Sequence, residues 1–244
     1  MDQIKIIYND EYLLVVDKPA GILVHETLAK EKDTLVNWLV TKYPDLKNLS
    51  WPDVTRPGIV HRLDKDTSGL IILAKNPKIL SELQKQFKER TIQKTYKALV
   101  LGKVEPVDGK IETLIVRGKA GIQQVREFNF SVSNETLRPA TTLYKTLDQY
   151  QFNKTDFSLL SVMPKTGRMH QIRVHLKYIN YPIVGDPLYN TKLSRNISKN
   201  IGLDHQFLHA EKLEFQHPIE NKILKFESDL PNELANTLAK LEKV

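Results

Sequence analysis

The 244-residue sequence contains no cysteine. That absence excludes a disulfide scaffold, a cysteine-ligated zinc site, an iron–sulfur cluster and a thiol nucleophile. Long apolar stretches are missing too, since no run approaches the roughly 18 residues that indicate a membrane-spanning helix. The N-terminus lacks the basic and apolar segments of a signal peptide. We therefore expect a cytoplasmic protein without a membrane partner.

Acidic residues are scarce in two stretches of the chain, so the positive charge is uneven. The formal net charge is +7 at pH 7. Residues 51–100 contain ten basic and five acidic side chains, and residues 151–200 contain eight and two. If the two stretches meet in the fold, they form a basic face of the kind that binds phosphate backbones. On charge alone, a solvated surface explains the same counts equally well.

Hydrophobic periodicity predicts a mixture of strands and helices. Helices are predicted for residues 34–43, from Pro77, after Thr166 or Gly167, and from Pro231. Strands are predicted for residues 5–8, 12–16, 70–74, 95–101, 111–116, 125–132, 141–147, 157–162, 207–215 and 223–226. The polar residues 190–206 are predicted to form a surface loop. The expected fold class is α+β with a mixed, mostly antiparallel sheet and flanking helices, in one domain or one domain with two lobes.

A polar loop between two apolar runs is the most informative segment. Residues 59–60 and 70–74 should be buried, so both ends of the loop are held by the core. Its polar side chains are His61, Arg62, Asp64, Lys65, Asp66, Thr67 and Ser68. Asp66, Thr67 and Ser68 can equally satisfy their own backbone in a turn. For Asp64, we favour a functional role.

A second cluster lies in the helix predicted after Thr166 or Gly167. His170, Arg173 and Lys177 share one face of that helix, and Arg168 lies at its start, where free N–H groups favour an anion. A phosphate-facing surface and a solvated basic face are both compatible with this pattern. His170 and His175 are five residues apart and point to different helix faces, so we expect no metal site.

A third pattern is Lys94-Thr-Tyr-Lys-Ala on a predicted strand. A tyrosine between two lysines can stack on a base while the lysines neutralise phosphate. Alone this signal is weak, because tyrosines in strands are usually packing residues.

Taken together, these segments resemble the RluA-type pseudouridine synthase family. The resemblance rests on motifs in the family's order, which are Asp17-Lys-Pro-Ala-Gly, His61-Arg-Leu-Asp-Lys-Asp-Thr-Ser-Gly, Lys94-Thr-Tyr-Lys-Ala, Thr166-Gly-Arg-Met-His-Gln-Ile-Arg-Val-His-Leu, Tyr181-Pro-Ile-Val-Gly-Asp-Pro-Leu-Tyr and His217-Pro-Ile. It implies a catalytic domain over residues 1–244 with a central catalytic cleft. Many members carry an N-terminal RNA-binding domain, which is not expected here.

The resemblance also implies a role for individual residues. Asp64 matches the catalytic aspartate, and Arg173 matches the basic residue that pairs with it. Tyr96 matches the tyrosine that stacks on the target uracil. The expected substrate-binding residues are His61, Arg62, Lys94, Arg168, His170, Gln171 and Ile172, with Arg62 helping to displace the target base and Ile172 lining the pocket.

The implied reaction is isomerisation of uridine to pseudouridine in ribosomal or transfer RNA. Nothing is oxidised or hydrolysed, so no cofactor or metal is expected, and we expect a monomer whose partner is RNA. One alternative is an RNA chaperone or ribosome-assembly factor on the same fold. A second alternative, a metal hydrolase, is disfavoured by the ligand spacing.

Overall fold

The computed structural model describes residues 4–27, 31–118, 122–128 and 137–244, which fall into two compact units. Unit 1 comprises residues 1–94 and 210–229, and unit 2 comprises residues 95–209 and 230–244. The prediction of one catalytic domain over the whole chain stays a prediction. In the described segments, no helix has the length and apolar character needed to cross a membrane.

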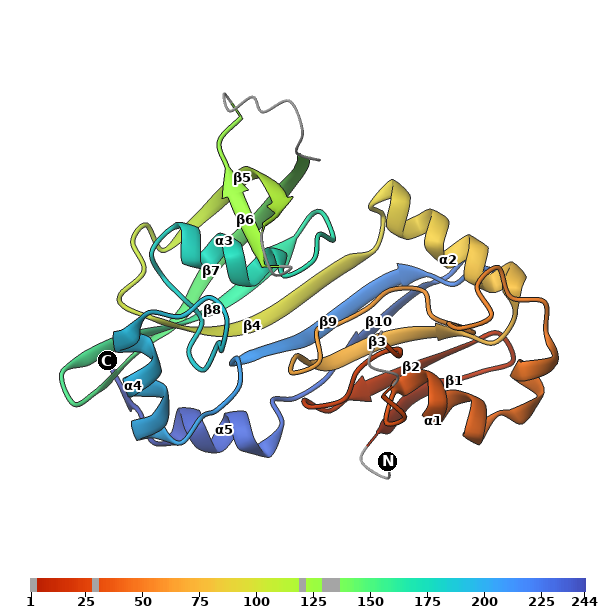
Figure 1. Ribbon diagram of the computed structural model, residues 1–244, viewed down its shortest axis with the longest axis horizontal. Coiled ribbons are helices and arrows are strands. Elements are labelled where there is room, and N and C mark those ends of the chain that lie inside the picture. Colours follow the sequence, from red (N-terminus) through yellow and green to blue (C-terminus); the bar gives the residue numbers. More distant parts are fainter. Residues whose placement is uncertain (1–3, 28–30, 119–121, 129–136) are drawn as a thin grey trace. The chain divides into compact units, whose positions relative to one another are not determined.

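Unit 1 is built on a sheet with the strand order β1-β2-β3-β9, to which β10 is added next to β9. The β1–β2, β2–β3 and β9–β10 pairs are antiparallel. The strands are β1 (Lys5–Asn9), β2 (Leu13–Lys18), β3 (Ser68–Ala74), β9 (Leu208–Gln216) and β10 (Ile223–Glu227). The helical segments are α1 (Leu35–Lys42), the 3₁₀ turn η1 (Pro44–Asn48) and α2 (Pro77–Glu89). Figure 1 shows α2 running along this sheet.

Strand β3 is the centre of unit 1, and all seven of its residues are buried. A strand covered on both faces needs a continuous apolar sequence, which residues 70–74 supply. Gly69 has a φ of +113°, and a Cβ there would lie 2.3 Å from the carbonyl oxygen of Ala210, so no larger residue fits. Helix α2, which packs against β3, begins as predicted, because Asn76 Oδ1 accepts the N–H of Ile79 at 2.9 Å.

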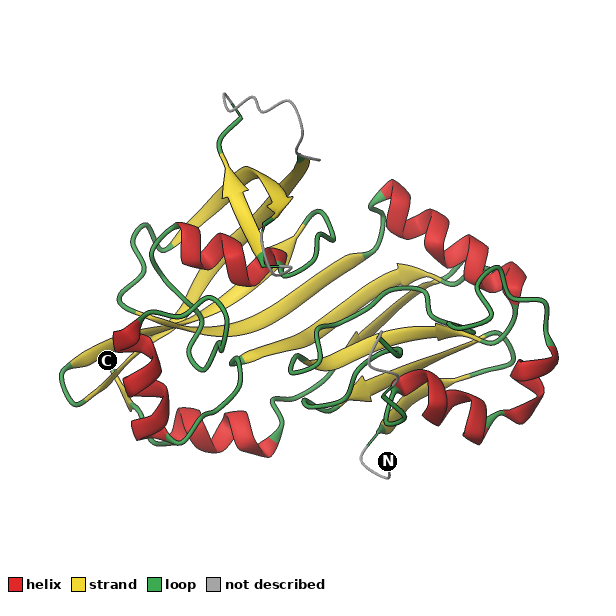
Figure 2. Ribbon diagram, viewed as in Figure 1, coloured by secondary structure: helices red, strands yellow, loops and turns green. Residues whose placement is uncertain are grey.

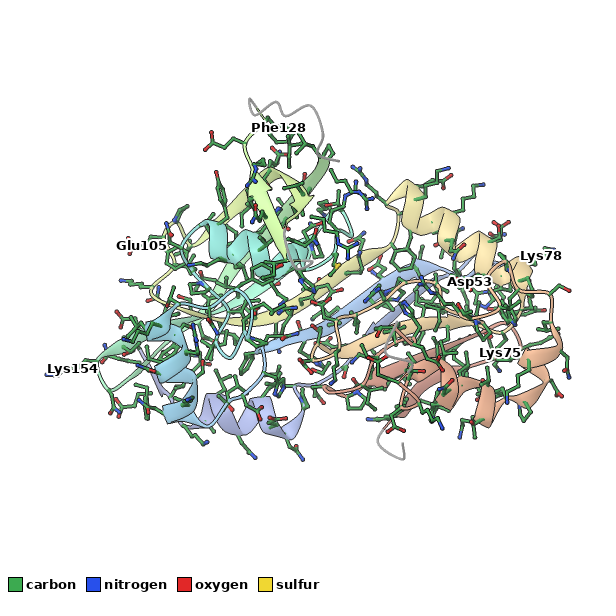
Figure 3. All side chains as sticks on the ribbon, viewed as in Figure 1. Asp53, Lys75, Lys78, Glu105, Phe128 and Lys154 are labelled. Carbon is green, nitrogen blue, oxygen red and sulfur yellow. The ribbon has the colours of Figure 1, made fainter. Side chains whose placement is uncertain are left out.

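The turn between β1 and β2 is held by Asp10. Its carboxylate accepts the backbone N–H groups of Tyr12 and Leu13 and contacts the buried His217 ring at 2.9 Å. Lys75, labelled in Figure 3 where β3 leads into α2, donates to Asn9 Oδ1 at 2.6 Å. These contacts tie the turn to β3 and to the β9–β10 connection without using the loop that precedes β3.

Unit 2 contains the strand order β4-β8-β7-β5-β6, with the short strand β11 beside β7. Every pairing among them is antiparallel. The strands are β4 (Gln93–Leu101), β5 (Asp108–Arg117), β6 (Gln123–Arg126), β7 (Arg138–Phe152), β8 (Thr155–Pro164) and β11 (Glu242–Lys243). The helices are α3 (Gln171–Tyr178), α4 (Lys192–Ile201) and α5 (Asn232–Ala239). Helix α3 packs against β6, β7 and β8 (Figure 1).

Helix α4 corrects the prediction of a surface loop at residues 190–206. Thr191 Oγ1 accepts the N–H of Ser194 at 3.1 Å, and Gly202 ends the helix in the left-handed conformation. The buried residues between these caps lie at helical spacing and are Ser194, Ile197, Ser198 and Ile201. Two of the four are serines, so an analysis that counted only apolar residues missed the stripe.

The predicted fold class is confirmed, since the described strands form mostly antiparallel sheets flanked by helices (Figure 2). One strand is shifted: the prediction of residues 125–132 becomes β6 at Gln123–Arg126, and Glu127 and Phe128 lie outside any strand. Residues 129–132 lie outside the described residues. The predicted central cleft stays a prediction.

Candidate active site

The loop that carries Asp64 starts and ends on the same buried strand of unit 1. Before the loop, Ile59 bridges to Leu73, and the carbonyl of Gly58 accepts the N–H of Ala74 at 2.8 Å. After it, the chain continues directly into β3. Within it, the Asp64 carbonyl accepts the Thr67 N–H at 3.1 Å, which closes a turn. Asp64 itself is half-buried, so its carboxylate is presented by a rigid support.

Lys18 supports this loop from inside unit 1. Its side chain is completely buried, and Nζ donates to the carbonyls of Pro19, Ile22 and Lys65 at 2.8, 2.9 and 2.9 Å. Burial lowers the pKa of Lys18 to about 7, although nearby carboxylates oppose that shift. Those carboxylates are Asp66, Asp64 and Asp17. Because Lys65 follows Asp64, the Lys18 ammonium holds the backbone of the residue next to the predicted catalytic group.

His61, Phe87 and Lys94 form a stack in unit 1. The His61 ring lies 4.5 Å from the Phe87 ring, and Lys94 Nζ lies 5.3 Å from the centre of the same ring. His61 Nε2 accepts the N–H of Ile72 at 3.1 Å. Burial, with the Lys94 charge, lowers the pKa of His61 to about 3, so the imidazole is neutral at pH 7. His61 therefore packs against Phe87 and accepts a backbone N–H, and its predicted role in substrate binding stays a prediction.

Lys94 is a cation without a nearby acid in the described part of the chain. Burial lowers its pKa to about 8, and no carboxylate contributes an opposing shift. Its one described interaction is with the Phe87 ring, which is worth about 0.5–2 kcal/mol. A largely desolvated ammonium in this setting can gain much more from an anionic ligand.

Arg62 lies on the exposed side of the same loop, near the buried His25. Burial and the charges of Arg56 and Arg62 lower the pKa of His25. Arg56 is held by Asp53, labelled in Figure 3, at 3.6 Å. Arg62 thus belongs to a small basic group beside the loop.

Tyr96 lies on β4 of unit 2, opposite Val162 of β8. It shares one strand face with Ala98 and Val100, as predicted, and all three are buried. The sheet therefore holds the ring in place, and its exposed fraction is only 9%. Stacking on a base requires the remaining exposed edge or a shift of neighbouring groups.

The start of α3 differs from the prediction, because neither Thr166 nor Gly167 caps the helix. The N-terminal cap is His170, whose φ of +53° is left-handed. Gln171 fixes the preceding turn: Oε1 accepts the Thr166 hydroxyl at 2.7 Å and the Arg168 N–H at 3.0 Å. Arg168 lies before the first residue of the helix, not at its free N–H groups. Its Nε donates to the carbonyl of Pro139 at 3.1 Å.

Arg173 is a buried side chain, which corrects the prediction of a basic helix face. Only 4% of it is exposed, and it forms a two-point ion pair with the fully buried Asp186. Nε donates to Asp186 Oδ2 at 2.7 Å, and Nη2 donates to Oδ1 at 2.9 Å. The predicted pairing of Arg173 with Asp64 joins residues of different units and stays a prediction.

The other residues of α3 divide between packing and hydrogen bonding. Ile172 is buried. His170 Nδ1 lies 2.9 Å from the Tyr189 hydroxyl. His175 is fully buried between the Thr113 and Thr142 hydroxyls, and burial lowers its pKa to about 4.

Among the described residues, one group has ligand atoms close enough to share a metal ion, and it includes neither His170 nor His175. That group is Asp204, His205 and Glu233. His205 Nδ1 already lies 3.2 Å from Asp204 and 3.3 Å from Glu233, so hydrogen bonds account for the arrangement.

Comparison with known proteins assigns the chain to a family. Residues 12–178 match the RNA pseudouridylate synthase family, a span that includes Lys18, the Asp64 loop, β4 and α3. The chain belongs to the RNA pseudouridylate synthase family. It is an isomerase that acts on RNA, and the resemblance to the RluA-type synthases is confirmed.

Individual relatives support this assignment along nearly the whole chain. The uncharacterized RNA pseudouridine synthase YlyB of Bacillus subtilis is 39% identical over 238 residues, which cover 98% of this chain and 73% of that protein. Ribosomal large subunit pseudouridine synthase D of Borreliella burgdorferi is 41% identical over 240 residues, covering 98% and 69%. The structure of human RNA pseudouridylate synthase domain containing 4 has 27% identity and a TM-score of 0.71, covering 98% of this chain and 94% of that chain.

In this synthase, two supporting residues have no role in the sequence prediction. Lys18 and Asp186 lie inside motifs that the sequence contains, but the resemblance assigned neither of them a role. A lysine flanked by Asp17 and Pro19 does not by itself indicate burial. The Gly-Asp-Pro turn at Asp186 indicates a loop, where a carboxylate is normally solvated.

Proposed function

We propose that this synthase converts uridine to pseudouridine in ribosomal RNA of the large subunit, with Asp64 as the catalytic residue. The observation that carries the proposal is the half-buried Asp64 carboxylate on a loop whose two ends are held by β3. Several relatives are named for the ribosomal large subunit, which favours this substrate over transfer RNA. We further propose that it acts as a monomer in the cytoplasm, where such a substrate is assembled.

The reaction needs a carboxylate and no electron carrier. The bond between uracil N1 and C1′ of the ribose breaks, C5 bonds to C1′, and the proton lost from C5 is balanced by one gained at N1. Asp64 is proposed to act on the sugar or the base, and Arg173 to orient it. The target base must leave the RNA stack at a cost of a few kcal/mol, which stacking on Tyr96 offsets by about 1–3 kcal/mol.

Lys94 is proposed to bind a phosphate close to the target nucleotide. A half-buried ammonium with only an aromatic face as a described partner gains a charge-assisted hydrogen bond when a phosphate oxygen approaches. Arg62, which is exposed on the Asp64 loop, is proposed to contact the RNA backbone as well.

Substitution of Asp64→Asn tests the catalytic assignment. The variant keeps the shape of the side chain but removes its charge and nucleophilicity. We expect it to fold, to bind RNA at least as tightly as the parent protein, and to form no pseudouridine. Asp66→Asn is the matched control, because it changes a carboxylate two residues away in the same loop, and it should keep its turnover. Product is measured by derivatisation or chromatography, since the isomerisation leaves the mass unchanged.

Turnover by Asp64→Asn that is free of deamidation would remove Asp64 from the mechanism. If the parent protein binds RNA but forms no pseudouridine on any substrate, the chaperone or assembly-factor alternative replaces the enzyme. Mapping of pseudouridine in total RNA, with and without the gene, tests the substrate. Loss of a site in large-subunit RNA supports the proposal, and loss only in transfer RNA overturns it.

A further inference from the structure

We propose that Asp186 is a positioning residue for the isomerisation, because it sets the direction in which Arg173 presents its guanidinium. This inference rests on the proposed function, in which Arg173 orients the catalytic carboxylate. Asp186 is 13 residues after Arg173 and outside α3, in the turn that follows the bridge at Ile183.

The Asp186 carboxylate is itself fixed by the backbone of its own turn. Oδ1 accepts the N–H of Leu188 at 2.8 Å and the N–H of Tyr189 at 2.9 Å. The same atom accepts Nη2 of Arg173, while Oδ2 accepts Nε. With three donors on one oxygen and one on the other, the carboxylate has little freedom to rotate. The carboxylate therefore sets the orientation of the Arg173 guanidinium that binds to it.

A second contact restrains the plane of the guanidinium. The Tyr189 ring lies 5.2 Å from Arg173 Cζ. Tyr189 is anchored at its far end, because its hydroxyl accepts the N–H of Gln123 at 2.8 Å and lies 2.9 Å from His170 Nδ1. Two fixed partners, one at the edge of the guanidinium and one at its face, leave the group a single orientation.

Asp186 binds two of the five N–H groups of Arg173, one on Nε and one on Nη2. Both of these groups lie on the Nε and Nη2 edge of the guanidinium, so Asp186 fixes the direction of that edge. The Arg173 side chain is almost completely buried, so the residues around it hold the guanidinium in place. A displacement of about 1 Å at a group that orients a reacting atom can cost about 100-fold in rate.

The test compares Asp186→Asn and Asp186→Glu with Asp10→Asn as the matched control. Asp10 also accepts two backbone N–H groups and contacts a buried basic side chain, but it makes no contact with Arg173. For each variant, thermal unfolding, RNA affinity and the single-turnover rate at saturating RNA are measured below the unfolding transition. We expect Asp186→Asn to lower the rate about 100-fold with little change in RNA affinity.

Asp186→Glu provides the second arm, because it keeps the charge but moves the carboxylate by one methylene. We expect it to remain folded and to lose at least about tenfold in rate, while Asp10→Asn loses stability and keeps its rate. A folded Asp186 variant with the rate of the parent protein overturns the inference. So does failure of both Asp186 variants to fold, since the residue would then serve the fold alone. If the parent protein itself forms no pseudouridine, the proposed function fails instead.

Discussion

The two units support their predicted reactive groups in opposite ways. In unit 1 a buried cation, Lys18, lies beneath the carboxylate loop and acts on it through the carbonyl of Lys65. In unit 2 a buried carboxylate, Asp186, binds the guanidinium of Arg173 directly. One support fixes a backbone, and the other fixes a side chain. The difference follows from the placement of the two groups, one in a loop and the other on a helix.

A loop residue can be positioned through its backbone, because the chain on both sides is held by β3 and only the turn between needs a support. A long side chain on a helix has several rotatable bonds, and fixing the helix backbone leaves its tip undefined. Direct pairing is then the way to define it. Substitutions of the supports should therefore change different properties, the stability of the loop in unit 1 and the rate in unit 2.

The largest expected effect on stability is that of Lys18→Met. Three carbonyls lose their donor, and we expect the free energy of unfolding to fall by about 2–4 kcal/mol. The pH dependence identifies the group. Since the pKa of Lys18 is about 7 in the folded state, against an ordinary value of 10.5, the unfolded state binds more protons between these pH values. Stability of the parent protein should rise with pH across this range.

The Lys18→Met variant should lack the part of this increase in stability that comes from Lys18. Urea unfolding at pH 7 and pH 9.5 measures it, with Lys212→Met as a control on an exposed ion pair of the same unit. An equal rise with pH in the parent protein and in Lys18→Met would mean that the ammonium is not desolvated as the structure indicates.

Acid should destabilise the two units through different histidines. His175 in unit 2 has a pKa of about 4, against an ordinary value of 6.5. Between pH 6.5 and pH 4 the histidine is therefore protonated in the unfolded state and neutral in the folded state, so stability falls as the pH falls. We expect the loss to reach about 3 kcal/mol near pH 4. The His61 contribution in unit 1 should extend further, because its pKa is about 3.

Urea unfolding of His175→Gln and His61→Gln between pH 7 and pH 3.5 separates the two contributions. Each variant should show a shallower acid slope than the parent protein, and the two variants should differ from each other mainly below pH 4, where only the His61 contribution continues to grow. A parent slope retained in both variants would assign acid sensitivity to other groups.

RNA affinity should depend on Lys94 and on pH together. The ammonium of free protein is charged below its pKa of about 8, so a phosphate ligand binds without a change of protonation there. Above that value, binding must first recover the proton, and we expect affinity to fall about tenfold between pH 8 and pH 9.5. Lys94→Arg should bind equally at both values, and Lys94→Met weakly at both. A tenfold fall that persists in Lys94→Arg would place the titrating group elsewhere.

The sequence predicted features that depend on neighbouring residues, and it missed features that depend on contacts made by the fold. The order of elements followed from apolar runs and caps such as Asn76-Pro77, because these signals depend on neighbouring residues. The motif residues Asp64, Tyr96 and Arg173 followed from the family resemblance. Lys18 and Asp186 could not be assigned, because their roles depend on partners brought together by the fold, 47 and 13 residues away. Helix α4 was missed for a third reason, since half of its buried stripe is serine.

The smallest predicted effect tests that missed helix against one that was predicted. Thr191 caps α4 and Asn76 caps α2, each through one side-chain oxygen bound to the N–H three residues later. Loss of such a cap costs about 1 kcal/mol. Thr191→Ala and Asn76→Ala should therefore lower the free energy of unfolding by similar amounts, measured in urea at pH 7. Gly202→Ala should add a further loss in α4, because residue 202 has a φ of +76°, where a side chain is strained. If Thr191→Ala and Gly202→Ala leave stability unchanged while Asn76→Ala lowers it, residues 192–201 contribute no stable helix, and the predicted loop describes them better.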